Sequence, residues 1–406
     1  MRYLGIDFEL KNLPELDHGF IPMGPWMNAF EAKAKRPVSI AVEAAGGRIV
    51  TRQTAVIADG KYDDADYRYL ERLVKFLLWS VGGYRVLISG ADAVAERLKR
   101  AYAPGGERAF DAQFMDDVFE RGFSIEPCSP EQFPQSSGES VSVGGHMNGC
   151  RIGFDAGGSD RKVSAVIDGE CVYSEEVVWH PKTTADPQYH FDEIVKAFQT
   201  AAEKMPRVDA IGVSSAGVFV GNSPMVSSLF LKVPREHRAF LKDIYNAAAR
   251  KIGDGNVPIV VANDGDVTAL AGAMELKTGA VMGLAMGTSE AVGYVNKQGN
   301  ILGWFNELAF APVDLSEDAL IDEWSGDIGV GCKYFSQDAV IKLAPAAGIT
   351  LSDGLTPAEK LKEVQKLLEQ GWDAAAGIYR TIGAYLAHTL ALYEKFYDIR
   401  HLLVLG

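Results

Sequence analysis

The chain has 406 residues, of which 47% are hydrophobic and 23% are charged, a length and composition that predict a soluble protein of several domains. Its net charge of −14 argues against nucleic acid and anionic membranes as partners. The four cysteines form no C-x-x-C pair, no apolar run could span a membrane, and the first residues lack a signal-peptide core. We therefore expect a cytoplasmic protein without a disulfide framework.

Residues 1–126 are expected to form an α/β module of their own. Two strands, 38–43 and 48–57, flank a Gly-Gly turn at 46–47. Leucine and valine residues between 70 and 78 recur at helical spacing and predict a helix. The next elements are a buried strand at 84–90 and a helix at 91–102.

Residues 127–149 are rich in proline, serine and glycine and are typical of a linker. The same order of elements then recurs, with a strand hairpin at 151–178, a helix at 191–205 and a strand at 208–214. Residues 38–90 and 163–214 are therefore either a degenerate internal duplication or a coincidence, because strand-strand-helix-strand is common in α/β proteins. Both alternatives remain open at this point.

The remaining chain continues the α/β pattern. We expect strands at 259–262, 281–286 and 291–295, and helices at 268–276, 357–369 and 372–397. Residues 150–262 would form a first lobe and residues 263–406 a second one. The last residues, 400–406, are typical of a strand that has just reached its turn glycine, so we expect a fragment of a longer protein, with the second lobe truncated.

Three short motifs carry the chemistry of the sequence. They are Asp155-Ala-Gly-Gly-Ser159 after a strand, Asn263-Asp264 at the end of another strand, and Gly287-Thr288-Ser289 between two strands. Each has an ordinary interpretation by itself, as a turn, a helix N-cap and a hairpin. Together, in this order and each at a strand edge, they indicate phosphoryl transfer.

Phosphoryl transfer depends on positioning and on charge neutralisation. Gly157, Gly158, Ser159, Gly287, Thr288 and Ser289 would surround the phosphates of ATP, because glycine allows close approach of the backbone. Asp155 would hold Mg²⁺ through water. Asp264 would accept the proton of the attacking hydroxyl group, with Asn263 beside it to bind a sugar hydroxyl.

These motifs resemble those of the ROK family of sugar kinases and relatives, within the actin-like ATPase superfamily. The similarity extends over residues 150–406, and it includes the segments Ile211–Gly217 and Val260–Leu270. The resemblance implies a two-lobed, ribonuclease H-like α/β fold, here with an extra N-terminal α/β module. It also implies ATP and Mg²⁺ as cofactors, Asp264 as the general base, and sugar contacts from Ser215, Gly217 and Glu307.

The chain departs from the family pattern where the family binds zinc. In the segment that begins at Glu307, Phe310 stands where the family has a histidine that contacts zinc and sugar. The cysteine cluster that follows is reduced to Cys332, and one thiolate cannot make a structural zinc site. We expect no zinc, with the segment 322–329 taking over the structural task of the zinc loop by packing Trp324.

Other polar residues have more ordinary interpretations. Asp266 is expected to cap or complement the start of a helix, although it could also reach substrate or metal. Glu290 is expected to face solvent or a neighbouring strand. Lys162 could approach a phosphate, but in an exposed hairpin it is expected to be solvated, and the histidines lack the spacing of metal ligands. Ser214 and Ser215 lie outside any G-x-S-x-G elbow, which argues against hydrolase chemistry.

We therefore expect an ATP-dependent, glucokinase-like kinase that phosphorylates a hydroxyl group of a hexose or amino sugar. The alternative is a catalytically weak or inactive sugar-binding or regulatory protein of the same fold. A DNA-bound regulator is disfavoured by the acidic charge. A homodimer is possible, and the sequence does not reveal the sugar.

Overall fold

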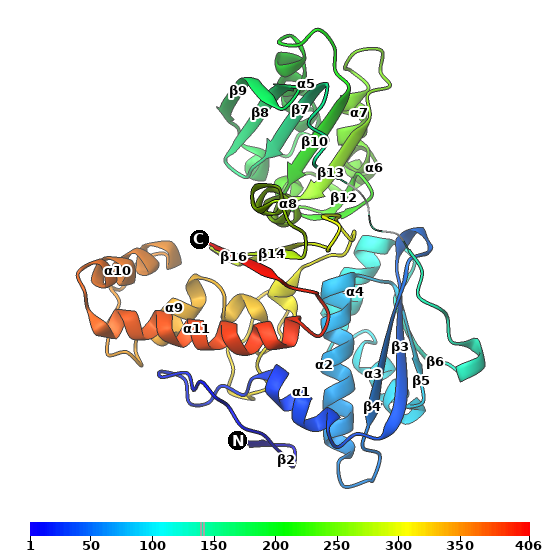
Figure 1. Cartoon of the computed structure of the whole chain (residues 1–406), viewed down its shortest axis with the longest axis vertical. Coiled ribbons are helices and arrows are strands. Elements are labelled where there is room, and N and C mark those ends of the chain that lie inside the picture. The colour runs from blue at the N-terminus through cyan, green and yellow to red at the C-terminus, as the bar shows by residue number, and fades with distance from the viewer. Residues whose placement is uncertain (139, 141–142) are drawn as a thin grey trace.

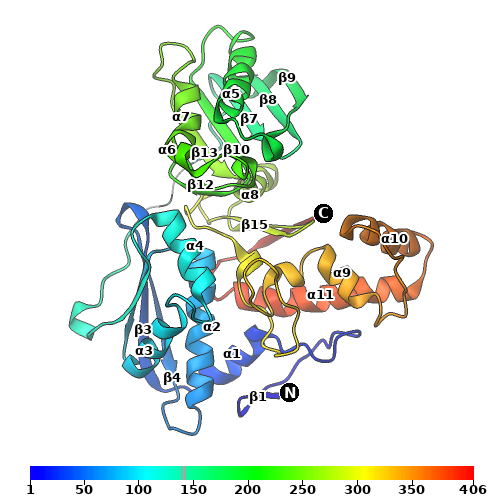
Figure 2. The same ribbon diagram turned by 180° about the vertical axis from the view of Figure 1, so that it is seen from behind.

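The computed structural model describes residues 1–138, 140 and 143–406. In Figure 1 a first lobe (green) lies above an N-terminal part (blue to cyan) and a C-terminal part (yellow to red). The view from behind in Figure 2 shows the same arrangement, with the N-terminal and C-terminal parts side by side below the first lobe.

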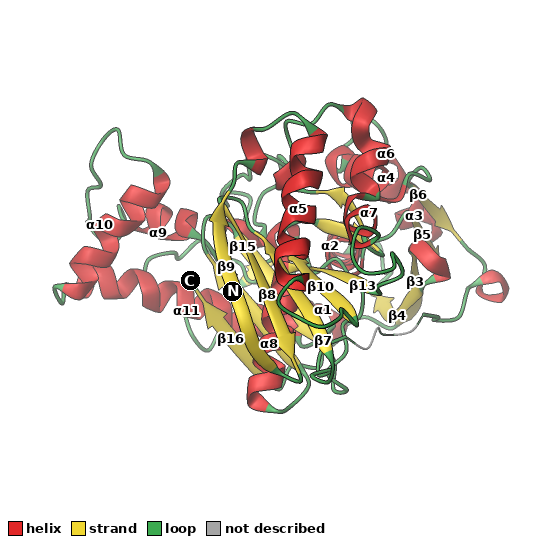
Figure 3. Cartoon of the chain, turned by 90° about the horizontal axis from the view of Figure 1, so that it is seen from above, coloured by secondary structure: helices red, strands yellow, loops and turns green. Residues whose placement is uncertain are grey.

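The first lobe is built on a five-stranded sheet of order β13-β10-β7-β8-β9. Strands β7, β8 and β9 form an antiparallel meander, and β10 and β13 run parallel to β7. Helices α5 and α7 pack on one face of the sheet, as Figure 3 shows. The elements are β7 (Cys150–Ala156), β8 (Asp160–Ile167), β9 (Glu170–Val178), α5 (Pro187–Ala202), β10 (Ala210–Ser215), α7 (Ile244–Ala249) and β13 (Ile259–Asn263). This strand order is the ribonuclease H-like arrangement that the sequence predicts.

A small hairpin and a short helix extend this lobe toward the N-terminal part. The hairpin consists of β11 (Val218–Val220) and β12 (Ser223–Val226), and the helix is α6 (Arg238–Lys242). Arg238 donates a hydrogen bond to the carbonyl oxygen of Asp117, and Lys242 pairs with Glu120. These contacts join the first lobe to the N-terminal part at the surface.

The second lobe contains a three-stranded sheet of order β15-β14-β16. Strand β14 pairs antiparallel with β15 and parallel with β16. A capping box of Thr356 and Glu359 begins α10. The elements are α8 (Asp264–Leu276), β14 (Val281–Met286), β15 (Glu290–Val295), α9 (Gln337–Leu343), α10 (Pro357–Glu369), α11 (Asp373–Tyr393) and β16 (His401–Leu405).

Helix α8 connects the two lobes and packs closely on the second sheet. A Cβ atom on Gly293 would lie 1.9 Å from the carbonyl oxygen of Gly265, so only glycine allows this approach. Similarly, a Cβ atom on Gly272 would lie 2.0 Å from the Leu403 side chain. The start of α8 is therefore fixed at the junction of the two sheets.

The N-terminal part is a four-stranded sheet of order β4-β3-β5-β6 with helices packed against it. Helix α2 is almost entirely buried and runs along this sheet. The elements are β1 (Arg2–Tyr3), β2 (Ile6–Asp7), α1 (Met23–Glu31), β3 (Arg36–Glu43), β4 (Ile49–Val56), α2 (Asp63–Val81), β5 (Arg85–Ser89), α3 (Asp92–Ala101), α4 (Ala109–Phe119) and β6 (Ser124–Pro127).

The N-terminal and C-terminal parts share one hydrophobic core. The rings of Phe76 on α2 and Phe396 after α11 stack with centroids 4.2 Å apart. The segment that leads into α1 runs along the C-terminal helices, where Asp17 pairs with Lys342 at 2.6 Å and the Asn12 carbonyl oxygen lies 2.7 Å from Nε2 of His388. The two parts are thus held together by buried apolar surface, which is the main stabilising contribution in folding.

The expected strands and helices are confirmed, with boundaries shifted by a few residues. The strand pairing of 38–90 and 163–214 differs, because β5 pairs antiparallel with β3 whereas β10 pairs with β7 and not with β8. The duplication therefore receives no support. The expected linker includes Glu139, Val141 and Ser142, which lie outside the described residues. In the part of the chain that the structure describes, no helix is long and apolar enough to cross a membrane.

Candidate functional site

Three parallel strands of the first lobe end side by side and bring the predicted residues together. In the sheet register, Asp155 is paired with Ser214, and Ser214 with Ala262. One residue further along, Ser215 is paired with Asn263. Because the carboxyl ends of parallel strands meet at one edge, the first and second motifs lie at the same edge of the sheet.

Asp264 is the first residue of α8, and the preceding residue is its N-cap. The Oδ1 atom of Asn263 accepts a hydrogen bond of 2.7 Å from the N–H of Gly265, and its Nδ2 atom donates to the carbonyl oxygen of Gly217 at 2.8 Å. The N-cap interpretation of Asn263 is thus realised in the structure. Asp264 is exposed to solvent, and its Oδ1 atom accepts one hydrogen bond of 2.9 Å from the N–H of Gly265.

Asp264, Asp266 and Glu307 form a group of carboxyl groups that interact electrostatically. Partial loss of hydration among the surrounding protein atoms raises the pKa of Asp264, and the negative charge of Asp155 raises it further. Burial, together with the charges of Asp264 and Asp266, raises the pKa of Glu307 to about 7. Burial and the charge of Asp264 likewise raise the pKa of Asp266 to about 7. Such shifts are typical of functional sites.

The N-terminal part positions the loop that carries Glu307. The N–H of Glu307 donates a 3.0 Å bond to the carbonyl oxygen of Trp79, and the N–H of Asn306 does the same to Ser80. These carbonyl groups belong to the last turns of α2, where helix carbonyls have no partner within the helix. The Asn306 side chain donates a hydrogen bond to Oδ1 of Asp266 at 2.8 Å, so Asp266 on α8 also helps to hold this loop in place.

The first glycine turn has a cation beside it that the sequence did not reveal. A Cβ atom on Gly158 would lie 2.5 Å from Nζ of Lys182, so the ammonium group of Lys182 lies against the turn. The hydroxyl group of Ser159 donates to Asp160 at 2.9 Å, and Asp160 also pairs with Lys162 at 3.2 Å. The Asp155 carboxylate makes no hydrogen bond or ion pair with another side chain among the described residues.

The second glycine turn, Gly287–Ser289, lies exposed between β14 and β15. The N–H of Gly287 donates to the carbonyl oxygen of Ser289 at 3.1 Å, and a Cβ atom on Gly287 would approach no other atom closer than 4.0 Å. The turn therefore has open space on its outer side. Thr288 is exposed within it.

A cavity of about 420 Å³, here called the Asn263 cavity, lies where the N-terminal part meets both lobes. Gly217 and Asn263 line it, so two of the predicted substrate-binding residues face the same space. The N-terminal part contributes Arg48 and Phe119 to its wall. Ser215 does not line this cavity. It is fully buried, and its hydroxyl group lies 2.8 Å from that of Tyr245, a residue of the hydrophobic core of the first lobe.

A second cavity of about 740 Å³, here called the Asp155 cavity, lies between the open face of the first sheet and α8. Asp155 and Ser214 line it. Its walls include Val260 and Ala262, which also line the Asn263 cavity, so the two cavities adjoin along the end of β13. Asp264 follows directly after this shared wall.

Aromatic side chains surround Phe310, the residue at the position of the family's histidine. Its ring centroid lies 4.5 Å from that of Trp79 and 5.2 Å from that of Trp324. Phe110 lies 6.1 Å away, and Trp324 keeps 61% of its surface exposed. Trp324 thus packs edge to face against Phe110 of the N-terminal part, within a cluster of aromatic rings.

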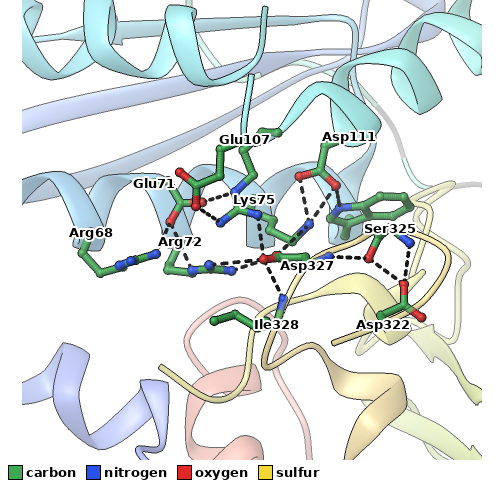
Figure 4. Close-up of polar contacts among 12 residues, drawn as sticks. Arg68, Glu71, Arg72, Lys75, Glu107, Asp111, Asp322, Ser325, Asp327 and Ile328 are labelled. Atoms are coloured by element: carbon green, nitrogen blue, oxygen red, sulfur yellow. Dashed lines mark hydrogen bonds and ion pairs between the residues drawn. The ribbon is translucent and has the colours of Figure 1, made fainter. Parts of the chain in front are cut away.

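The loop 322–328 is tied to the N-terminal part by buried ion pairs, shown in Figure 4. The Asp327 carboxylate is bound by Arg72 at 2.9 Å, by Lys75 at 3.3 Å and by Arg108 at 2.6 Å. Burial alone would raise the pKa of Asp327, but these three cations hold it well below its usual range. Lys75 also pairs with Asp111 at 2.7 Å. These ion pairs hold the loop 322–328 against the N-terminal part.

Glu290 is a buried carboxyl group next to the second glycine turn. Its Oε1 atom accepts a bond of 3.1 Å from the Tyr393 hydroxyl, while Oε2 is buried without a hydrogen-bond partner among the described residues. Burial and the charge of Glu307 raise its pKa to about 8. The expectation that Glu290 faces solvent or a strand neighbour is therefore wrong, because the turn at Gly331 packs directly against it.

Within residues 1–138, 140 and 143–406, no group of three or more histidine, cysteine or acidic residues is arranged to hold a metal ion. Cys332 is buried, with its sulfur 3.6 Å from Asp322. The absence of zinc stays a prediction, and so does a Mg²⁺ ion held through water by Asp155.

Comparisons with known proteins show the fold of the chain. No protein-family model and no curated protein matches it. A ROK-family transcriptional regulator, a homologue of the E. coli MLC protein, is similar with a TM-score of 0.50 and 16% identity, over 64% of this chain and 66% of that chain. A ROK hexokinase from Thermus thermophilus has a TM-score of 0.47 and 16% identity, over 63% and 81% of the two chains.

A ROK-family glucokinase from Streptomyces griseus, solved with glucose and AMPPNP, has a TM-score of 0.44 and 20% identity, over 63% and 82% of the two chains. The chain thus has the actin-like ATPase fold of the ROK proteins, as the motifs predict. Identities this low establish the fold alone.

Proposed function

We propose that the protein is an ATP-dependent sugar kinase that phosphorylates a hydroxyl group of a hexose or amino sugar. The observation that carries the proposal is the group formed by Asp155, Asp264 and Glu307 at the junction of the lobes. Among the described residues, the side chains of Asp155 and Glu307 have no hydrogen-bond partner. Free carboxylates in one place are suited to reaction chemistry, because one can serve the metal and another the proton.

The donor side would lie at the first glycine turn and the adjoining Asp155 cavity. Gly158 leaves its backbone accessible, and Lys182 adds a positive charge beside it, a combination that fits the phosphate groups of ATP. Asp155 would hold Mg²⁺ through water, and Gly287–Ser289 would approach the phosphates from the other lobe. When bound, ATP supplies the phosphoryl group and Mg²⁺ neutralises part of its charge.

The acceptor side would lie in the Asn263 cavity. Asp264 would take the proton from a primary hydroxyl group of the sugar, and its raised pKa brings it closer to neutral pH, where a general base is most effective. Glu307 would accept a hydrogen bond from another hydroxyl group. The N-terminal part covers this side and would exclude water, which limits hydrolysis of ATP in the absence of sugar.

A second candidate is a sugar-binding or regulatory protein that has lost most of its catalysis. Phe310 favours it, because an aromatic group replaces the histidine that contacts sugar in the resembling family. The free carboxylate of Asp264 at the start of α8 favours the kinase. Either function would be carried out in the cytoplasm, where ATP and sugars are available.

The two candidates differ in turnover and not in sugar binding. ADP release should be measured with a coupled assay for a panel of hexoses and amino sugars, and binding of the same sugars by calorimetry. Sugar-dependent ADP release supports the kinase. Sugar binding without ADP release supports the second candidate, and the absence of both contradicts the two together.

A further inference from the structure

Arg48 brings a positive charge from the N-terminal part into the wall of the Asn263 cavity. It follows the turn of Gly46 and Gly47, whose φ angles of 70° and 75° suit glycine and turn the chain sharply into β4. The side chain crosses to the loop of the second lobe that runs from Ile301 to Phe305, which forms the opposite part of the cavity wall.

The guanidinium group of Arg48 is bonded only to backbone carbonyl groups. Nη1 donates to Gly303 and, at 3.4 Å, to Leu302, and Nη2 donates to Val81 at 3.3 Å. The Nε–H group is buried and has no hydrogen-bond partner in the described part of the chain. A guanidinium carries five N–H donors, and the three carbonyl bonds leave two of them without a partner in the described residues, the buried Nε–H and one N–H of Nη2.

No carboxylate compensates the charge of Arg48 among residues 1–138, 140 and 143–406, and burial lowers its pKa. The fully buried arginines of the N-terminal part differ from the half-buried Arg48, since Arg72 and Arg108 both pair with Glu71 and with Asp327. A buried cation without a counter-charge is unfavourable unless a ligand completes it.

The remaining wall of the cavity suits a sugar ring. Phe119, Phe219, Trp304 and Phe305 give it apolar surface, and Asn263 and Asp266 give it polar groups at one end. Sites of this kind, apolar with a few placed polar groups, are typical for small ligands, and the volume of about 420 Å³ lies in their usual range.

We propose that Arg48 binds an anionic group of the substrate, so that the protein acts on a sugar that carries a carboxylate or a phosphate ester. This inference rests on the proposed function and narrows its substrate class. A guanidinium group attracts both kinds of anion through its charge and through charge-assisted N–H bonds. A neutral hexose leaves the charge unpaired and is therefore bound more weakly.

The test is calorimetric binding of glucose, glucuronate and glucose 1-phosphate to the whole protein. The two charged ligands separate a carboxylate from a phosphate ester. The wild type is compared with Arg48→Gln and with Arg52→Gln. Arg52 is a matched control, because it lies four residues further along, on β4, and its Nε atom is also buried without a partner in the described chain. Its guanidinium group covers the Phe396 ring at 5.0 Å and does not line the cavity.

We expect at least one charged ligand to bind the wild type about ten- to a hundredfold more tightly than glucose. Arg48→Gln should remove this difference between charged ligands and glucose, while Arg52→Gln should keep it. The comparison of charged ligands with glucose in the wild type remains valid even if Arg48→Gln does not fold. Arg48→Lys then keeps the positive charge but changes the geometry of the N–H donors, and we expect an intermediate preference for the charged ligand.

Equal binding of glucose and both charged ligands by the wild type overturns the inference and leaves the proposed kinase intact. Loss of the preference in Arg52→Gln also overturns it. Arg48-dependent binding of a charged sugar without any ADP release supports the inference and contradicts the kinase. Absence of binding for all three ligands contradicts both.

Discussion

The backbone N–H of Glu307 donates a hydrogen bond of 3.0 Å to the carbonyl oxygen of Trp79. A residue of the N-terminal part thus fixes the loop that carries a candidate substrate-binding carboxylate. Nearby, the ring of Phe119 stacks on that of Phe305 with centroids 5.4 Å apart. The N-terminal part therefore belongs to the structure of the site and covers it.

The first prediction concerns the dependence of the two lobes on the N-terminal part. A chain that begins at residue 143 would expose the apolar surface that Phe305, Leu308 and Phe310 bury against α2 and α4. We expect it to lack a cooperative thermal transition by circular dichroism. Co-expression with residues 1–142 as a separate chain should restore a soluble complex. A sharp transition of the shortened chain alone would contradict the shared core.

The second prediction concerns the buried charge network of Asp327. Replacing Asp327 by Asn leaves Arg72, Lys75 and Arg108 with one negative partner fewer, so the free energy of unfolding should fall by about 3–5 kcal/mol. Chemical denaturation measures this change. The exposed pair of Glu15 and Arg380 is the control, and Glu15→Gln should leave the denaturation midpoint unchanged. Equal effects of the two substitutions would contradict the role of burial.

The third prediction concerns the pH dependence of stability. Because burial raises the pKa of Glu290 to about 8, the folded state binds a proton that the unfolded state has lost above its ordinary pKa of about 4.5. The contribution of Glu290 protonation to the free energy of unfolding is therefore fully present below pH ~4.5 and is lost as the pH rises toward 8. Glu290→Gln should make the protein more stable than wild type at pH 9, by about 1.4 kcal/mol for each unit by which burial raises the pKa of Glu290.

Thermal or urea unfolding between pH 5 and 9 measures this difference. Glu369 is exposed, and Glu369→Gln should leave the pH profile unchanged. A wild-type stability that rises steadily between pH 5 and 9, and that Glu290→Gln does not alter, would mean that Glu290 is ionised in the folded protein.

The fourth prediction concerns the cation at the first glycine turn. Lys182→Ala should raise the KM for ATP by about tenfold, since a charged contact to phosphate is lost, and should change the KM for sugar little. Lys162 is the control because it is already paired with Asp160. If Lys162→Ala raises the KM for ATP and Lys182→Ala does not, the assignment of the two lysines is reversed.

The sequence predicts the elements of the chain and the strand ends of the site because these depend on local patterns. Asn263 and Asp264 come directly after an apolar strand, and the N-cap residue is visible in the sequence. The alternation of Ile211 and Val213 with Ser215 also indicates that Ser215 shares their buried face, a signal that could have excluded it as a sugar contact.

The contacts that complete the site come from parts of the chain that are far apart, and no local pattern indicates them. Arg72 and Asp327 are separated by 255 residues, and Arg48 and Gly303 by the same number. Lys182 reaches the turn of Gly158 only because the loop after β9 folds back over it. The first two contacts depend on how the N-terminal part packs against the second lobe, and the third depends on how a loop folds within the first lobe.

Replacement of Asp264 tests whether its carboxylate is the base of the proposed kinase reaction. Formation of phosphorylated sugar should be measured for the wild type and for Asp264→Asn, with sugar binding followed by calorimetry in the same samples. Asp254→Asn, at an exposed position, is the control. We expect the wild type and the control to phosphorylate a sugar, and Asp264→Asn to lose at least about a hundredfold in kcat while it still binds the sugar. Equal turnover of Asp264→Asn and the wild type would contradict the role of Asp264 as the base.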